Sequence, residues 1–164
     1  MSKNTFTLSS PDIAEGHFMA KQHEFDGFGC NGQNISPELH WHNAPAETKS
    51  FALTVFDPDA PTGSGFWHWI VTDIPVAATC LAKGAGTGSL PPGCRSFTND
   101  YGMKTFGGAC PPEGHGMHRY QFTIWALPEE ALPAPEGASA AVVGFMLNAM
   151  ALAKATLTAT YARD

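Results

Sequence analysis

Two stretches that are apolar on both faces, SFALTVFD at 50–57 and WHWIVTDI at 67–74, most constrain how this chain can fold. In the first, Phe51, Leu53 and Val55 alternate with side chains that are also mainly apolar. A short run with this pattern, bounded by Gly and Pro, is typical of a strand covered on both sides. We therefore expect both stretches to be central strands of a sheet.

The remaining elements follow from the same periodicity rules. HRYQFTIWAL at 118–127 predicts a third strand, and KATLTATYAR at 154–163 predicts a final strand of period two. A shorter strand is expected within 39–45, and a helix over 140–153 with Ser139 as its N-cap. Strands do not alternate regularly with helices, so the order favours a mainly antiparallel β domain with peripheral helices over a doubly wound fold.

The length and the charge of the chain predict one domain and argue against two classes of binding protein. A chain of 164 residues predicts one domain over residues 1–164. The net charge of −6 and the absence of a basic run argue against binding to nucleic acid or to an acidic membrane surface. Residues 140–153 form too short an apolar run to span a bilayer, so no stable membrane insertion is expected. Only 15% of the residues are charged, which favours an interface between two copies and hence a homodimer.

The cysteine spacing and the first residues of the chain bear on the cellular compartment of the protein. Cys30, Cys80, Cys94 and Cys110 match no zinc-binding spacing. The opening residues MSKNTFTLSS lack the apolar core of a secretion signal. The protein is therefore expected to be cytoplasmic, with all four thiols reduced.

A carboxylate-rich turn and a histidine lie at the junction of the two central strands. Asp57 and Asp59 stand at i and i+2 in DPDAP, held by two prolines at the strand end. Alone, this motif also fits a turn in which aspartate caps backbone amides. His68 opens the next strand, so we expect a hydrogen bond to Asp57 that orients the ring and favours its protonated form. The alternative is a histidine bonded to a backbone carbonyl.

A third stretch, GGACPPEGHGMHRY, combines exposed backbone amides with donor side chains. Its glycines let a ligand approach the backbone closely, and Pro111 and Pro112 stiffen the wall. His118 begins a strand, and Tyr120 shares its face and could supply a hydroxyl donor. The other interpretation is a rigid turn followed by core aromatics. Arg119 points to the opposite side, where we expect it to bind a carboxylate or loop carbonyls.

Two histidine pairs have spacings that could also hold a metal. His115 and His118 are three residues apart, and His40 and His42 share one face of a short strand with Trp41 opposite. For both pairs we expect surface or hydrogen-bonded histidines and no metal.

Taken together, these motifs resemble the phosphatidylethanolamine-binding protein family, and within it the bacterial branch that is often labelled Raf kinase inhibitor-like. The stretches that carry the resemblance are NGQNISPELHW at 31–41, DPDAP at 57–61, WHWIV at 67–71, CPPEGHGMHRYQF at 110–122 and EGASAAVVGF at 136–145. The resemblance covers nearly the whole chain. It implies a mainly β fold in which a large antiparallel sheet packs on a smaller one, with helices at the C-terminal side.

The resemblance also implies a small anion-binding pocket. Carried over position by position, its residues are Asp57, Asp59, His68, Gly108, Pro111, Pro112, His118 and Tyr120. Gly108 is expected at the rim, and a cis peptide bond is expected at Ala60–Pro61. Ala109 departs from the family pattern, in which bacterial relatives frequently have proline.

These observations predict non-catalytic binding of small anions, namely phosphate, carboxylates or phosphoethanolamine-type headgroups. No cofactor is expected, and a regulatory role toward a partner protein is compatible with the resemblance. The alternative is a small hydrolase or lyase with Asp57, His68, His118 and Tyr120 as acid and base groups. A third hypothesis is a metal site that uses Asp57, His68, His118 and Cys110.

Overall fold

Two antiparallel sheets and one α-helix make up the regular structure of the protein, a computed structural model that describes residues 5–164. In chain order, the elements are β1 (Thr7–Ser9), a 3-10 helix (Lys21–His23), β2 (Leu39–His42), β3 (Ser50–Asp57), β4 (Phe66–Pro75), β5 (Cys80–Leu81), a second 3-10 helix (Ala85–Thr87), β6 (Arg95–Ser96), β7 (His118–Leu127), α1 (Ala140–Met150) and β8 (Ala153–Tyr161).

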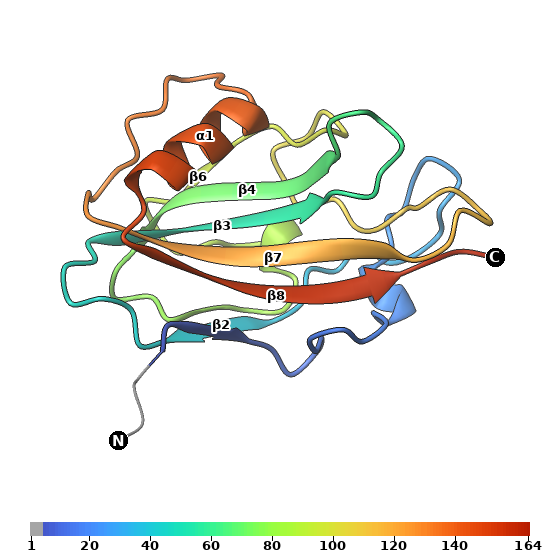
Figure 1. Ribbon diagram of the computed structural model, residues 1–164, viewed down its shortest axis with the longest axis horizontal. Helices are drawn as coiled ribbons and strands as arrows, with labels where there is room; N and C mark the ends of the chain where they lie inside the picture. The colour runs from blue at the N-terminus through green and yellow to red at the C-terminus, as the bar shows by residue number, and fades with distance from the viewer. Residues whose placement is uncertain (1–4) are drawn as a thin grey trace.

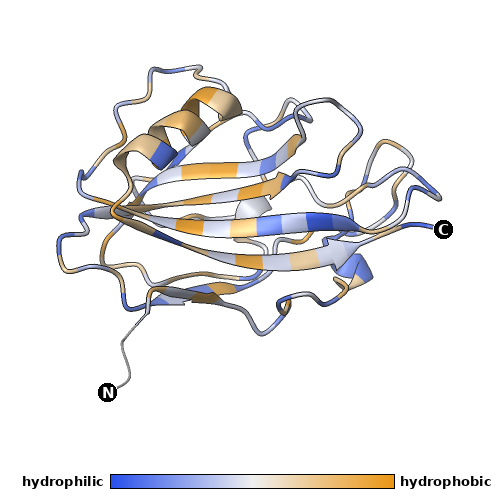
Figure 2. Cartoon of the chain, viewed as in Figure 1, coloured by the Kyte–Doolittle hydropathy of each residue, from blue (hydrophilic) through white to orange (hydrophobic). Residues whose placement is uncertain are grey.

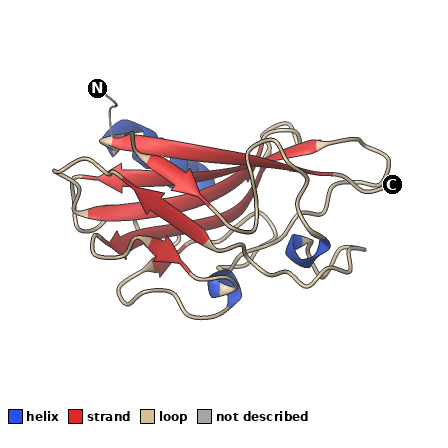
Figure 3. Cartoon of the chain, turned by 90° about the horizontal axis from the view of Figure 1, so that it is seen from below, coloured by secondary structure: helices blue, strands red, loops and turns tan. Residues whose placement is uncertain are grey.

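The elements form three layers (Figures 1 and 3). The large sheet has the strand order β6-β4-β3-β7-β8, and the small sheet has the order β1-β2-β5. All strand pairs within the two sheets are antiparallel. The small sheet packs on one face of the large sheet and α1 on the other, so the predicted mainly β architecture of a large sheet on a smaller one is confirmed.

The position of strand β3 between two hydrophobic cores explains why both of its faces are apolar. Leu53 and Val55 belong to the core between the two sheets, which also contains Trp41 of β2. Ala52 belongs to a second core under α1, together with Val143 of the helix. A strand that lies between two cores needs apolar side chains in both directions. The prediction that residues 50–57 form a central strand is therefore confirmed.

The C-terminal elements follow the predicted pattern with small shifts. Strand β7 covers the predicted residues 118–127, and β8 presents Leu157, Ala159 and Tyr161 to the core between the sheets. The hydroxyl of Ser139 accepts a hydrogen bond from the amide of Val142 at 3.2 Å, which confirms the N-cap. Helix α1 ends at Met150, before the predicted end at residue 153, because the chain turns there into β8. Figure 2 shows α1 as apolar over nearly its whole length.

The cysteine prediction is wrong. Cys30 and Cys110 form a disulfide with their Cα atoms 6.0 Å apart, while Cys80 and Cys94 are free. The pairing follows from the packing of two loops, because the amide of Phe25 donates to the carbonyl of Ala109 at 2.9 Å. Eighty residues separate the two cysteines, so sequence spacing gave no sign of their proximity.

The loops that carry the predicted pocket residues gather at one end of the large sheet, near the C-terminus (Figure 1). They are the β3–β4 connection and residues 107–117, and residues 23–37, which carry no predicted pocket residue, contribute Phe28 to the same end. The predicted cis bond at Ala60–Pro61 is wrong, since residues 5–164 contain no cis peptide bond and trans is the preferred isomer before proline. None of the helices in the described part of the chain is long and apolar enough to cross a membrane.

Candidate functional site

A cavity of about 170 Å³ opens where these loops meet the ends of β3, β4 and β7. Its walls consist of Phe28, Asp57, Ala60, Pro61, Thr62, Phe66, His68, Tyr101, Cys110, Pro111, Pro112, His118 and Tyr120. Six of the eight predicted pocket residues are in this set, which excludes Asp59 and Gly108. The lining contains no Lys or Arg, so the cavity lacks a permanent cation.

Asp57 and His118 form a buried pair on the cavity floor. Asp57 ends β3 and His118 begins the neighbouring strand β7, so the antiparallel pairing of the two strands brings them together. The carboxylate oxygen Oδ2 of Asp57 lies 2.7 Å from Nδ1 of His118, and its Oδ1 accepts from the amide of Asp59 at 2.8 Å. Because a carboxylate accepts hydrogen bonds, Nδ1 of His118 carries a proton.

The second nitrogen of His118 is also engaged. Its Nε2 lies 2.6 Å from Nδ1 of His115, whose side chain comes from the exposed loop before β7. Gly114 and Gly116 flank His115 and have φ values of 73° and 93°, a region in which glycine is favoured. Of the two outcomes expected for this pair, surface or hydrogen-bonded histidines, the structure shows hydrogen bonding.

His68 forms no hydrogen bond with Asp57, so the prediction of that bond is wrong. Asp57 is opposite Phe66 in the β3–β4 register, which places His68 further along the strand. Its Nδ1 instead donates to the carbonyl of Gly107 at 2.8 Å, which is the alternative expected from the sequence. Burial lowers the pKa of His68, so the ring is neutral at neutral pH. This contradicts the prediction of a protonated ring. With the proton on Nδ1, Nε2 of His68 is a hydrogen-bond acceptor.

Tyr120 contributes a donor that the fold leaves unused. The residue is 2% exposed and lines the cavity, yet its hydroxyl forms no hydrogen bond with any residue in the described range 5–164. Burial raises the pKa of Tyr120, so the phenol keeps its proton. Its ring meets that of His68 edge-on, with the centroids 5.2 Å apart. Two neighbouring residues of the cavity wall therefore offer one acceptor and one donor.

Asp59 lies outside the cavity because Arg119 engages both of its oxygens. The guanidinium donates to Oδ1 and Oδ2 at 2.9 Å each, and the Arg119 amide adds a third bond to Oδ2 at 2.9 Å. These side-chain hydrogen bonds from Arg119 lower the pKa of Asp59 to about 2. The prediction that Arg119 binds a carboxylate is confirmed, whereas the predicted place of Asp59 in the pocket is not.

Gly108 supports the wall from behind and is not at the rim. A side chain at this position would place its Cβ 2.1 Å from the carbonyl oxygen of His23. The amide of Gly108 donates to Oδ1 of Asn34 at 2.6 Å, and its carbonyl accepts from the hydroxyl of Tyr101 at 2.8 Å. The glycine is needed for this close approach of two backbones.

The sequence reasoning missed most of the aromatic wall. Phe66 and Tyr101 line the cavity and meet edge-on with their ring centroids 4.7 Å apart. Phe28, which is 73% exposed, covers the mouth and has a φ of 54° that is unusual for an aromatic residue. Phe66 could have been noted beside His68, but the loop residues Phe28 and Tyr101 carry no periodic signal.

The disulfide limits the chemistry of the site. Cys110 lines the cavity and is bonded to Cys30, so it supplies neither a thiolate nucleophile nor a metal ligand. Among residues 5–164, no three His, Cys, Asp or Glu side chains form a group that could hold a metal ion. What the arrangement offers is hydrogen bonding without Lys or Arg, beside the carboxylate of Asp57, in an aromatic recess.

The buried histidines predict how stability depends on pH. Burial lowers the pKa of both His23 and His68, whereas the unfolded chain takes up these protons near pH 6.5. Their contribution to stability is therefore complete above about pH 6.5 and is lost as the pH falls toward the folded-state pKa. We expect the free energy of unfolding to decrease by up to about 1.4 kcal/mol per pH unit for each of the two histidines.

Urea unfolding at pH 7.5 and pH 5.5 measures this decrease. His68→Gln removes one titrating group, so its stability should fall less between the two pH values than that of the wild type. His42→Gln is the control, because His42 is exposed and makes no ion pair within the described chain. Equal pH slopes for His68→Gln and the wild type would contradict the assignment.

Comparison with known proteins places the chain in a family. The model of the family described as phosphatidylethanolamine-binding protein matches residues 9–162. UPF0098 protein YbcL of Escherichia coli is 49% identical over 159 residues, covering 95% of this chain and 87% of YbcL. UPF0098 protein YbhB of the same organism is 45% identical, covering 94% of this chain and 98% of YbhB. The names of both relatives describe no enzyme.

Solved structures agree with this match. The crystal structure of E. coli YbcL, described as a new member of the mammalian PEBP family, superposes with a TM-score of 0.93 at 49% identity. The superposition covers 97% of this chain and 99% of the YbcL chain. The resemblance seen in the sequence motifs therefore extends over the whole fold, and this chain belongs to the phosphatidylethanolamine-binding protein family.

Proposed function

We propose that the cavity binds a small acidic group without catalysing a reaction on it, as in a phosphate monoester, a carboxylate or a phosphoethanolamine-type headgroup. The observation that carries the proposal is that the free Tyr120 hydroxyl and the acceptor nitrogen of His68 belong to residues that line the same cavity with their rings in contact. The name of the family, which refers to binding of phosphatidylethanolamine, supports a phosphate-bearing ligand.

The proposed ligand form follows from charge. The buried carboxylate of Asp57 repels a dianion, and the lining offers no Lys or Arg to offset that repulsion. A singly protonated phosphate or a carboxylic acid group matches the site, because its O–H donates to His68 and its second oxygen accepts from Tyr120. An ammonium group on the same ligand would pair with the carboxylate of Asp57 and lie against the aromatic rings of the wall. Without a cation in the site, we expect a Kd on the order of 10 μM to 1 mM.

The acid–base alternative lacks a free thiol or an unengaged Ser or Thr hydroxyl in the cavity lining. Cys110 is held in the disulfide, and the Thr62 hydroxyl, on the cavity wall, donates to the carbonyl of Gly65. Asp57 and His118 could move a proton, but no observation favours a hydrolase or lyase over a binding site.

Tyr120→Phe tests the proposal. The variant removes the unpartnered donor and no protein hydrogen bond, so stability should stay within about 0.5 kcal/mol of the wild type. Loss of a hydrogen bond to a charged oxygen should weaken phosphoethanolamine binding by about 10- to 100-fold. Titration followed by NMR and by calorimetry gives the affinities, and unfolding in urea gives the stability. Unchanged affinity in the variant, or no ligand-induced shift at His68 or Tyr120 in the wild type, would refute the proposal.

Compartment, assembly and protein partners stay predictions. The disulfide supports an oxidising compartment and is the observation that speaks against the cytoplasmic location expected from the sequence. A homodimer and a regulated protein partner are compatible with the sparse charge of the chain. Light scattering on the purified protein tests the dimer, and a species of 17.4 kDa alone would exclude it.

A further inference from the structure

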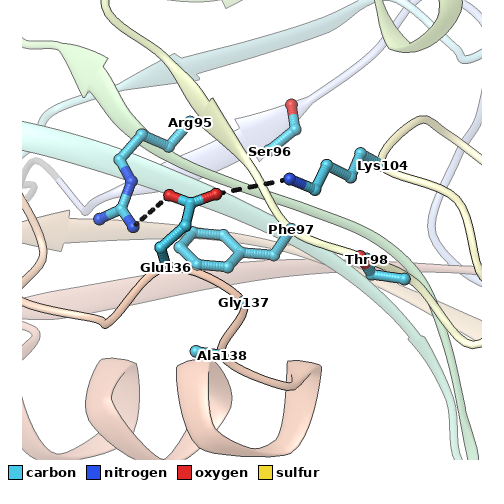
Figure 4. A pocket seen from close by; sticks show the side chains of 8 residues that line it. All are labelled: Arg95, Ser96, Phe97, Thr98, Lys104, Glu136, Gly137 and Ala138. Carbon is cyan, nitrogen blue, oxygen red and sulfur yellow. Dashed lines mark ion pairs between the residues drawn. The ribbon is translucent and has the colours of Figure 1, made fainter.

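A second recess, on the side of the large sheet where β6 pairs with β4, shares no lining residue with the candidate cavity. It has a volume of about 160 Å³. Its side chains are Arg95, Ser96, Phe97, Thr98, Lys104 and Glu136 (Figure 4). We refer to it as the Arg95 cleft. Two cations and one carboxylate face it, in a protein whose net charge is −6.

Arg95 is fixed in place by the backbone of the loop before α1. Its Nη1 donates to the carbonyl of Leu132 at 3.1 Å, and its Nη2 donates to that of Ala134 at 3.0 Å. The guanidinium also lies over the ring of Phe97, 4.8 Å from the centroid. These contacts use two of the five N–H donors of the group and hold the rest in a fixed orientation.

Glu136 is held only loosely between the two cations. Its Oε2 lies 3.8 Å from Nη2 of Arg95, and its Oε1 lies 3.5 Å from Nζ of Lys104. Charge-assisted hydrogen bonds are normally 2.7–2.9 Å long, so neither contact is one. The Glu136 side chain is 83% exposed, and exposed ion pairs of this kind stabilise a fold little. Glu136 can therefore leave the cleft at small cost.

The remaining groups of the cleft suit an oxyanion. The hydroxyls of Ser96 and Thr98 form no side-chain hydrogen bond within residues 5–164 and are free to donate. Gly137, next to the carboxylate, adds no side chain to the wall. Glu136 offsets only one of the two positive charges, so a ligand with two negative charges would balance the cleft better than Glu136 does.

We propose that the Arg95 cleft is a second anion site, which takes a dianionic phosphate group in place of the Glu136 carboxylate. In the occupied site, Arg95 and Lys104 contact the phosphate oxygens and Glu136 turns out into solvent. The group recognised is the same in inorganic phosphate and in a phosphate monoester. The proposal does not depend on the function proposed for the other cavity, because the two sites have no residue in common.

The test is an NMR titration of the full chain with inorganic phosphate and, separately, with glycerol phosphate, at constant ionic strength set by sodium chloride. We expect the amides of residues 96–98, 104 and 136–137 to shift with both probes. Shifts with inorganic phosphate alone would restrict the site to the free ion and still support it. No shift in these amides with either probe would overturn the proposal.

Substitutions at two exposed residues of the Arg95 cleft test the proposal further. Glu136→Gln removes the competing carboxylate and should tighten phosphate binding by about fivefold, whereas Lys104→Gln should weaken it by about fivefold. Tyr120→Phe is the matched control, since it should change shifts in the first cavity and leave those of the Arg95 cleft unaltered. If Glu136→Gln left the affinity unchanged or reduced it, Glu136 would not occupy the place of a ligand, and the proposal would fail.

Discussion

The variant with serine at both Cys30 and Cys110 is expected to lose about 4 kcal/mol of unfolding free energy. The disulfide closes a loop of 80 residues, and the entropy of the unfolded chain rises when so long a loop is opened. Urea unfolding under non-reducing conditions measures the change. The same variant should bind phosphoethanolamine more weakly, because the bond fastens the loop of Phe28 to the wall formed by Cys110.

Cys80→Ser is the control for the double variant. Cys80 is exposed and free, so its replacement should change stability by less than about 0.5 kcal/mol. A double variant that unfolds at the same urea concentration as the wild type would show that the disulfide contributes no stability. Normal ligand affinity in a destabilised variant would separate the stabilising role of the bond from its role at the cavity.

Asp57→Ala is expected to destabilise the protein by about 3–5 kcal/mol, and Asp59→Ala by less than about 1 kcal/mol. The two aspartates are a natural comparison, since each contacts a basic side chain at the start of β7. The pair of Asp57 with His118 has side chains only 3% and 2% exposed, whereas those of Asp59 and Arg119 are 29% and 56% exposed. Removing Asp57 leaves the buried Nδ1 of His118 without its hydrogen-bond acceptor.

Chemical denaturation of both variants at pH 7.5 makes the comparison. Similar losses for the two substitutions would mean that burial does not set the difference. Binding should also separate them, because only Asp57 lines the cavity. Asp59→Ala should keep its affinity for phosphoethanolamine. A lower affinity of this variant would show that Asp59 takes part in binding.

The long strands were predictable because alternation is a local signal that burial enforces. Residues 50–57 needed no knowledge of their partners, since apolar side chains on both faces report cover on both sides, and in residues 118–127 the apolar face reports which side is covered. Strands β1, β5 and β6 have only two or three residues, too few to show a period, so they were not predicted. Their existence depends on backbone pairing with a longer neighbour.

The candidate site was predictable in its members but not in its hydrogen bonds. The motifs around Asp57, His68 and His118 do meet in one cavity. Which imidazole contacts Asp57 depends on the register of the strands. His118 forms the hydrogen bond to the Asp57 carboxylate, whereas His68 lies further along β4 and donates to the carbonyl of Gly107. The disulfide and the Tyr101 wall come from loop packing over long sequence separations, which no local pattern encodes.

The contact between His115 and His118 has a kinetic consequence. Anything that approaches Nε2 of His118 first has to move the imidazole of His115, which occupies that nitrogen. The glycines on either side of His115 have more backbone conformations open to them than other residues do, and both adopt positive φ here. We therefore expect association at Nε2 of His118 to require displacement of the His115 ring and to proceed more slowly than diffusion would allow.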